Sequence, residues 1–152
     1  MARFRYRMQN ILNIKERQEE MQRNALAAAR LKLREEEEKL SGLMSRRADY
    51  REEGRAMRVK ALSVLDIMAN NHAVSTMDEM IASQRSHVAR AEKNVEIERQ
   101  RLTEAMQERK MHEKLREKAF EKFLKEERAL EAKTNDERSS FIYGQKTSYD
   151  VN

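Results

Sequence analysis

The chain has 152 residues with no proline, no cysteine, no tryptophan and only three glycines. Charged residues and hydrophobic residues each make up 39% of it, whereas aromatic residues contribute 5%. Sandwiches, barrels and doubly wound folds need turns rich in glycine and proline, so this composition argues against them and favours long helices. The absence of cysteine excludes disulfides, thiolate nucleophiles and cysteine-based metal sites, and it fits a reducing cytoplasm.

The net charge of +5 arises from 32 basic residues interspersed among 27 acidic ones. Interspersed charge is typical of solvated helix faces, and it makes nucleic-acid binding a distant alternative. The acidic run 35–38 is expected on such a face. We find neither an apolar run long enough to span a membrane nor a signal-peptide core, so an intracellular protein is expected.

A stripe of apolar residues predicts a first helix over about residues 4–58. The stripe loses its phase near residue 60, where Ser63 and Asp66 form a shortened capping box that favours a new helix start. We therefore predict a turn at about 59–63, with Gly54 marking where the first helix loosens. The stripe consists of Leu12, Leu26, Leu33 and Leu40 with Glu19 intruding, accompanied by Ala29, Leu43, Tyr50 and Met57.

A strict heptad repeat predicts a second helix over about residues 64–138, and the tail 139–152 is expected to be flexible. Such a repeat forms the seam of a coiled coil. At Arg109 and Arg116 the series turns basic, and such a residue either offers its charge to an acidic partner or ends the tightly paired region. The apolar series is Ile67, Val74, Ile81, Val88, Val95 and Leu102.

A reversal near residue 60 pairs residues whose numbers sum to about 122, which brings apolar side chains together along most of the seam. The predicted fold is all-α: an antiparallel two-helix coiled-coil hairpin, rod-like, with residues 1–138 as a single domain. One continuous helix that pairs with a second copy of the chain is the alternative. The expected pairs are Leu40 with Ile81, Leu33 with Val88, Leu26 with Val95 and Leu12 with Arg109.

No enzyme is expected from this material, because catalysis needs convergent groups in a water-excluded pocket. The histidines His72, His87 and His112 lack the spacing that would present two imidazoles on one helix face, so neither a metal nor another cofactor is expected. The chain also lacks a glycine-rich phosphate loop. Any nucleotide chemistry must then belong to a partner.

The start of the chain alternates arginine with aromatic residues, and a basic stretch around residues 110–125 is expected beside it. Arginine and tyrosine are favoured at the centres of interfaces, so a binding tip is a reasonable hypothesis. The segment 1–14 is also amphipathic and basic enough to lie on an anionic membrane.

Several short motifs resemble the bacterial FliJ proteins of the flagellar type III export apparatus. They are Phe4-Arg5-Tyr6-Arg7-Met8-Gln9-Asn10-Ile11-Leu12, Asp49-Tyr50-Arg51-Glu52, Met77-Asp78-Glu79-Met80-Ile81 with Gln84, Gln107 to Leu115, and Asn135-Asp136-Glu137. Their order and spacing extend over nearly the whole chain.

The resemblance implies an antiparallel two-helix coiled coil similar to the central stalk of rotary ATPases. It implies that the terminal end of the hairpin enters the pore of the hexameric export ATPase FliI and promotes assembly of the ring. Export chaperones are implied as further partners, and the implied location is the cytoplasm beside the cell membrane at the flagellar base. By position, the ATPase-facing residues are Phe4, Arg5, Tyr6, Arg7, Ile11 and Leu12, with Arg109, Lys110 and Lys114 opposite.

The same resemblance implies that the region toward the turn contacts the cytoplasmic part of the export gate FlhA, through Leu43, Tyr50, Met77 and Gln84. Where many members of the family carry an aromatic residue early in the second helix, this chain has Ala73. Ordinary seam packing is the alternative role for Leu43 and Met77. For the whole chain, the alternative is a coiled-coil scaffold or secretion chaperone that binds client proteins along its length.

Overall fold

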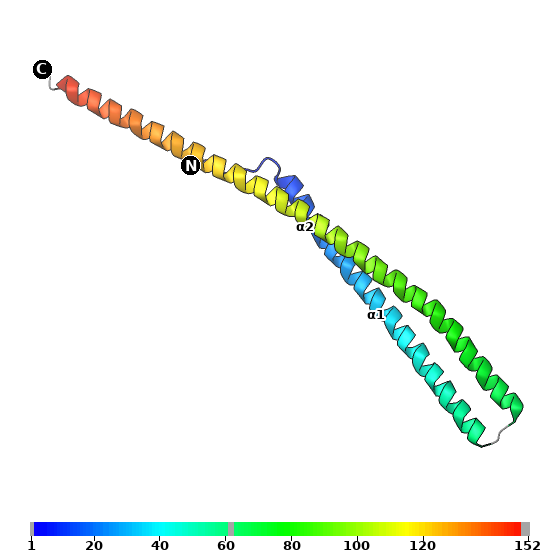
Figure 1. Ribbon diagram of the computed structural model, residues 1–152. Helices are drawn as coiled ribbons and strands as arrows, with labels where there is room; N and C mark the ends of the chain where they lie inside the picture. The colour runs from blue at the N-terminus through cyan, green and yellow to red at the C-terminus, as the bar shows by residue number, and fades with distance from the viewer. Residues whose placement is uncertain (1, 61–62, 150–152) are drawn as a thin grey trace. The chain divides into compact units, whose positions relative to one another are not determined.

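The computed structural model describes residues 2–60 and 63–149, and two long helices account for almost all of them. Helix α1 spans Gln9–Val59 and helix α2 spans Val64–Tyr149 (Figure 1). The described residues contain no strand. The predicted all-α helical hairpin is thereby confirmed, and the continuous helix is not the fold of this chain.

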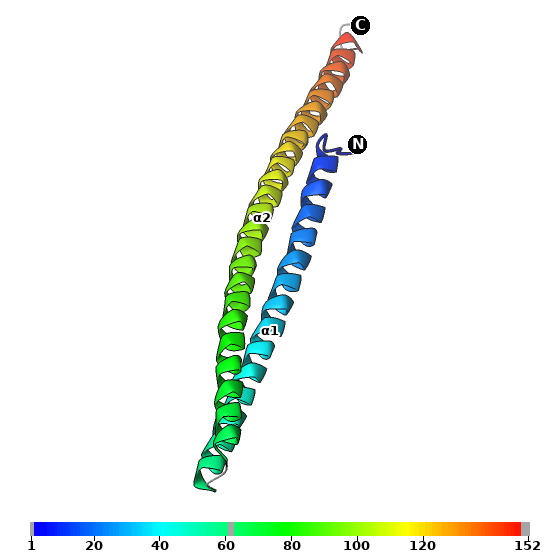
Figure 2. The ribbon, with the colours of Figure 1, turned by 90° about the vertical axis from the view of Figure 1, so that its right-hand side faces the viewer.

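The contacts within the chain group it into two units, one of residues 19–105 and the other of residues 1–18 together with 106–152. In the first unit, the remainder of α1 and the early part of α2 lie side by side in both views (Figures 1 and 2). In the second unit, the start of the chain lies against the later part of α2. The prediction of a single domain over 1–138 stays a prediction.

The start of α2 follows the predicted capping box. The Ser63 hydroxyl accepts a hydrogen bond from the Asp66 amide at 3.3 Å and donates one to the Asp66 carboxylate at 3.0 Å. The first bond satisfies a backbone N–H that the first turn of a helix leaves without an intrahelical partner, and the second joins the two side chains. The two central residues of the predicted turn, Ala61 and Leu62, lie outside the described residues.

The predicted helix ends need two corrections. Helix α1 begins at Gln9 rather than near Phe4, because the first residues leave the helical path and carry the Phe4 ring onto α2. Helix α2 continues to Tyr149 instead of ending near Arg138. Side chains 128–148 are all exposed, so this stretch of α2 is helical without a packed face.

The apolar core of the 19–105 unit is small and lies where the heptads predicted it. Leu26, Ala29 and Val95 are each 5–7% exposed and form one cluster, against which Leu33 and Leu102 pack. The predicted contact between Leu26 and Val95 is therefore confirmed. In such a narrow seam a few apolar side chains supply most of the hydrophobic stabilisation, so each contributes strongly to the free energy of folding.

Polar side chains interrupt the apolar ones along this seam and fix its register. The amides of Gln22, Asn70 and Gln84 donate hydrogen bonds to the backbone carbonyls of Glu98, Tyr50 and Glu36, at 3.3, 2.8 and 2.9 Å. The residue numbers in each pair sum to 120, close to the predicted 122. A slip between the helices would break all three bonds and leave buried amides unsatisfied.

Glu36 corrects the expectation that the whole acidic run is solvated. Its side chain is buried in the seam, where it accepts a hydrogen bond from Gln84 at 2.5 Å and pairs with Lys32 at 2.9 Å. These two hydrogen bonds, that of Lys32 foremost, lower the pKa of Glu36 to about 2 against the opposing effect of desolvation. The reason is the heptad register, which turns residue 36 toward α2 while its acidic neighbours stay exposed.

This carboxylate predicts a pH-dependent stability. Because the folded pKa lies below the ordinary value of 4.5, the stabilisation is present above about pH 5 and is lost as the pH falls toward 2. Glu36→Gln should therefore lower the chemical denaturation midpoint at pH 7, and the difference from the wild type should shrink as the pH approaches 2. Glu38→Gln, at an exposed position of the same run, is the control. It should change neither the denaturation midpoint at pH 7 nor the dependence of that midpoint on pH. A pH-independent effect of Glu36→Gln would contradict this role.

Candidate functional site

An aromatic cluster anchors the start of the chain in the unit formed by residues 1–18 and 106–152. The Phe4 ring lies 5.1 Å from that of Phe120, at an edge-on angle of 68°, and 5.4 Å from that of Phe123. The Arg116 guanidinium lies 5.8 Å above the Phe4 ring and donates a hydrogen bond to the Gln9 side chain at 2.9 Å. These contacts explain why an extended segment without regular structure stays on the surface of α2.

The anchored segment presents its charges outward. Phe4 and Tyr6 are half-buried, whereas Arg3, Arg5 and Arg7 between and beside them are exposed. A shallow groove of about 460 Å³ runs along the segment, with Lys122 and Glu126 of α2 on its far side. The basic and aromatic residues of the predicted tip thus form one surface on the side of α2, which continues beyond them to Tyr149, and its binding role stays a prediction.

The remaining candidates on α1 divide between surface and core. Ile11 is 38% exposed and is available to a partner, whereas Leu12 is 3% exposed and belongs to the packing between the helices. A role for Leu12 is therefore to hold the tip rather than to touch another protein.

The three basic candidates on α2 lie beside the second turn of α1, within one turn of the expected pairing of Arg109 with Leu12. Lys15 pairs with Glu108 at 2.8 Å, which places this stretch beside the second turn of α1 and away from Phe4. Arg109 pairs with Glu113 at 2.8 Å, while Lys110 and Lys114 are exposed. The Lys15 ammonium also lowers the pKa of Glu108 by hydrogen bonding and by its charge.

Phe120 and Phe123 are the partners of Phe4 that sequence reasoning missed. The signal was present, because a chain that reverses near residue 60 brings residue 4 to about residue 118. The seam series passes through Phe123, but Phe120 lies outside both heptad series. The contact was hidden because the first residues are not helical, so the heptad pattern does not apply to them.

Two polar atoms in this unit are buried without a hydrogen-bond partner in the described part of the chain: the Tyr6 hydroxyl oxygen and His112 Nδ1. A buried polar group in this state costs about 1–3 kcal/mol.

The four gate-facing candidates lie in the other unit, residues 19–105, and all occupy seam positions. Leu43 and Tyr50 are half-buried, whereas Met77 and Gln84 are each 8% exposed. The Gln84 amide is already engaged by Glu36. Leu43 and Tyr50 therefore keep part of their side chains exposed to a partner, whereas Met77 and Gln84 are packed inside the seam.

Nothing in the described residues resembles a catalytic centre. No group of three or more histidine, cysteine or acidic side chains within 2–60 and 63–149 could hold a metal ion. Neither described helix combines the length and apolarity that a membrane span requires. The arrangement is suited to binding other macromolecules along helix faces and at the tip.

Comparisons with known proteins agree with the motifs. The family model described as flagellar FliJ protein matches residues 4–148. A solved structure of a YscO homologue from Chlamydia trachomatis has the same fold, with a TM-score of 0.80 over 96% of this chain and 99% of that one, at 22% sequence identity. No curated protein matches the chain.

Proposed function

The chain belongs to the flagellar FliJ protein family, and from this premise we propose that it is the stalk of the flagellar type III export ATPase. Membership of this family makes the chain a component of the type III export machinery. The proteins of the family are non-catalytic components of that apparatus. In the proposal, the amino-terminal tip inserts into the hexameric ring of FliI and promotes assembly of the ring. The chain then works in the cytoplasm, at the membrane face of the flagellar base.

The observation that carries the proposal is the construction of the tip. Phe4 is fixed between two aromatic rings of α2, so Arg5 and Arg7 project from an anchored segment rather than from a loose terminus. Preorganised arginines lose less conformational entropy on binding than arginines in a disordered tail.

The other unit supports a second contact. We propose that Leu43 and Tyr50 meet the cytoplasmic domain of the export gate FlhA, with Met77 and Gln84 holding the seam behind them. Tyr50 is half-buried and its backbone carbonyl is fixed by Asn70, so the ring has a defined position at the edge of the seam. Export chaperones are the third class of partner in the proposal.

The test is the turnover of the purified hexameric ATPase from the same source, with and without this protein. Wild-type protein should raise turnover, and Arg5→Glu combined with Arg7→Glu should return it to the basal rate, because like charges then meet at the contact. Arg30→Glu combined with Arg34→Glu is the matched control, since both residues are exposed on α1 and lie outside the tip.

Unchanged turnover with the wild-type protein, or equal losses in the two double variants, would contradict the proposal. A scaffold that binds clients along its length would give a different result: deletion of residues 1–10 would leave client binding intact. In the proposed stalk the same deletion removes the stimulation of the ATPase.

A further inference from the structure

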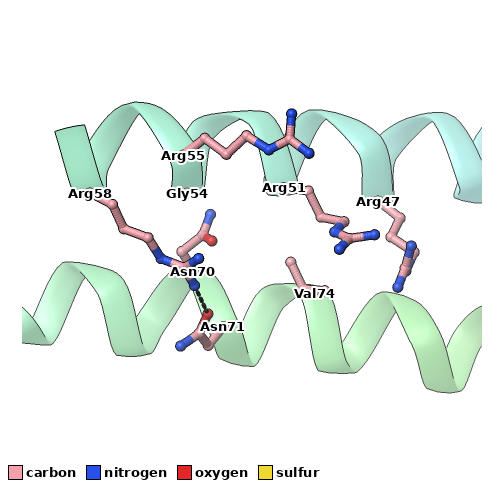
Figure 3. Close-up of a pocket in the computed structure, with 8 residues that line it drawn as sticks. All are labelled: Arg47, Arg51, Gly54, Arg55, Arg58, Asn70, Asn71 and Val74. Atoms are coloured by element: carbon pink, nitrogen blue, oxygen red, sulfur yellow. Dashed lines mark hydrogen bonds between the residues drawn. The ribbon is translucent and has the colours of Figure 1, made fainter.

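A basic groove near the turn end of the 19–105 unit belongs to neither surface described above. Arg47, Arg51, Arg55 and Arg58 line a recess of about 250 Å³ together with Asn70 and Asn71 of α2. Figure 3 shows Arg47 and Arg51 descending from α1 toward Val74, while Arg58 reaches down to Asn71. The side chains of Arg47, Arg51 and Arg58 thus lean toward α2, whereas Arg55 runs along α1.

The positive charge of the groove is poorly compensated. Residues 46–60 carry six basic and three acidic side chains, and the facing stretch of α2, residues 67–77, has no Asp, Glu, Lys or Arg. Other buried and half-buried parts of the seam are uncharged or pair opposite charges, as Lys15 and Glu108 do elsewhere. The excess here is a local property of the groove and not a consequence of the overall charge.

The arginines differ in how far they are engaged. Arg47 forms an ion pair with Asp78, and Arg58 makes a long hydrogen bond of 3.5 Å to Asn71. Arg55 pairs with Glu52 at 3.7 Å, with both side chains 75% exposed, a pair of little energetic value. Arg51 has no hydrogen bond or ion pair to any described residue. Three guanidinium groups therefore retain donors for a ligand.

The spacing of the arginines specifies the shape of that ligand. They follow one another at intervals of four, four and three residues, which at 1.5 Å rise per residue is about 4.5–6 Å per step. Acidic side chains on one face of an α-helix have the same spacing. Carboxylates on one face of a helix laid along the groove could meet the guanidinium groups of Arg51, Arg55 and Arg58, since guanidinium binds carboxylate through paired hydrogen bonds.

We propose that this groove binds an acidic helical segment of a partner protein. A recess of about 250 Å³ between two helices has room for side chains of a further helix that lies across it, whereas a flat bilayer would not enter it. The lining contains no aromatic side chain on which a nucleic-acid base could stack. The groove lies outside the residues assigned to the ATPase and the gate, so this proposal stands apart from the proposed function.

The test uses the full-length protein and a labelled alanine-rich helical peptide with glutamates at intervals of four, four and three residues. Binding is followed by fluorescence anisotropy at about 50 mM salt, where screening is moderate. The variant Arg51→Gln, Arg55→Gln, Arg58→Gln should weaken binding about tenfold or more. Arg47 is left in place, because its pair with Asp78 joins the two helices.

The matched control removes the same charge from exposed positions of the same unit: Arg30→Gln, Arg34→Gln, Arg90→Gln. This control should weaken binding no more than about twofold, as expected from long-range charge alone. The single change Arg51→Gln, at a residue without described partners, should also weaken binding while circular dichroism stays at the wild-type value. A peptide with glutamine in place of glutamate should not bind.

Three results would overturn the proposal. The first is absence of peptide binding to the wild-type protein. The second is equal weakening in the groove variant and the control variant, which would show non-specific attraction. The third is tighter binding of anionic lipid vesicles or duplex DNA through the same three arginines, which would assign the groove to a membrane or a nucleic acid instead.

Discussion

Replacing Leu26 with alanine is expected to lower the free energy of unfolding by about 2–3 kcal/mol. Leu26 is 5% exposed and lies at the centre of the cluster with Ala29 and Val95, where few other apolar side chains contribute. The loss combines the transfer energy of the missing carbons with the cavity that two long helices close only partly. The midpoint of urea denaturation, followed by circular dichroism at 222 nm, gives the measurement.

Leu31→Ala serves as the control for this prediction. Leu31 lies on the same helix and is 55% exposed, so its truncation should change stability by less than about 0.5 kcal/mol. Equal effects of the two substitutions would mean that Leu26 does not lie in a packed seam.

The two glycines of α1 are expected to respond in opposite directions to alanine. A Cβ added at Gly42 would have no atom within 4 Å other than those of the surrounding helix backbone. Gly42→Ala should therefore stabilise the helix by about 1 kcal/mol. At Gly54 the same Cβ would lie 3.2 Å from Asn70 Cγ and closer still to Oδ1. The Asn70 amide must then move, and its hydrogen bond to the Tyr50 carbonyl is lost.

We expect Gly54→Ala to destabilise the protein by about 1 kcal/mol, because a strained and unsatisfied buried amide outweighs the gain in helix propensity. The cause can be isolated in a background that carries Asn70→Ala, where Gly54→Ala should become stabilising, as at Gly42. Thermal and urea unfolding of the four combinations provide the data. A stabilising Gly54→Ala in the wild-type background would refute the contact.

The glycines also show what a single sequence could and could not predict. The sequence predicted only that Gly54 marks where the first helix loosens, because composition cannot say what a missing side chain makes room for. The structure gives Gly54 a partner within the chain, Asn70, at a position where the heptad pattern indicated only a polar interruption. Only the paired geometry of both helices contains that information.

The helices were predictable wherever local chemistry and periodicity decide the structure. The capping pair of Ser63 and Asp66 starts α2 at Val64, and the heptad phase places Leu26 against Val95. Prediction failed at the two ends. The position of Phe4 is set by its aromatic contacts on α2 and not by helix propensity. The last part of α2 stays helical although it lacks the heptad periodicity that was used to predict the end of the helix.

The site was predictable in composition but not in its contacts. The arginine and aromatic alternation of residues 3–7 identified the tip, whereas its anchoring by Phe120 and Phe123 required the fold. Glu36 was assigned to the surface because an acidic run is usually solvated, and the register placed it in the seam. In each case a tertiary contact overrode a local preference.

The central claim is that the anchored tip enters the ring of the export ATPase, and site-specific photo-crosslinking tests it most directly. A photoreactive amino acid placed at Arg5 should capture the ATPase in the assembled ring, and the same group at Arg30 should not. Capture from Arg30 with none from Arg5 would contradict the account, because the ATPase would then bind along the helices and not at the tip.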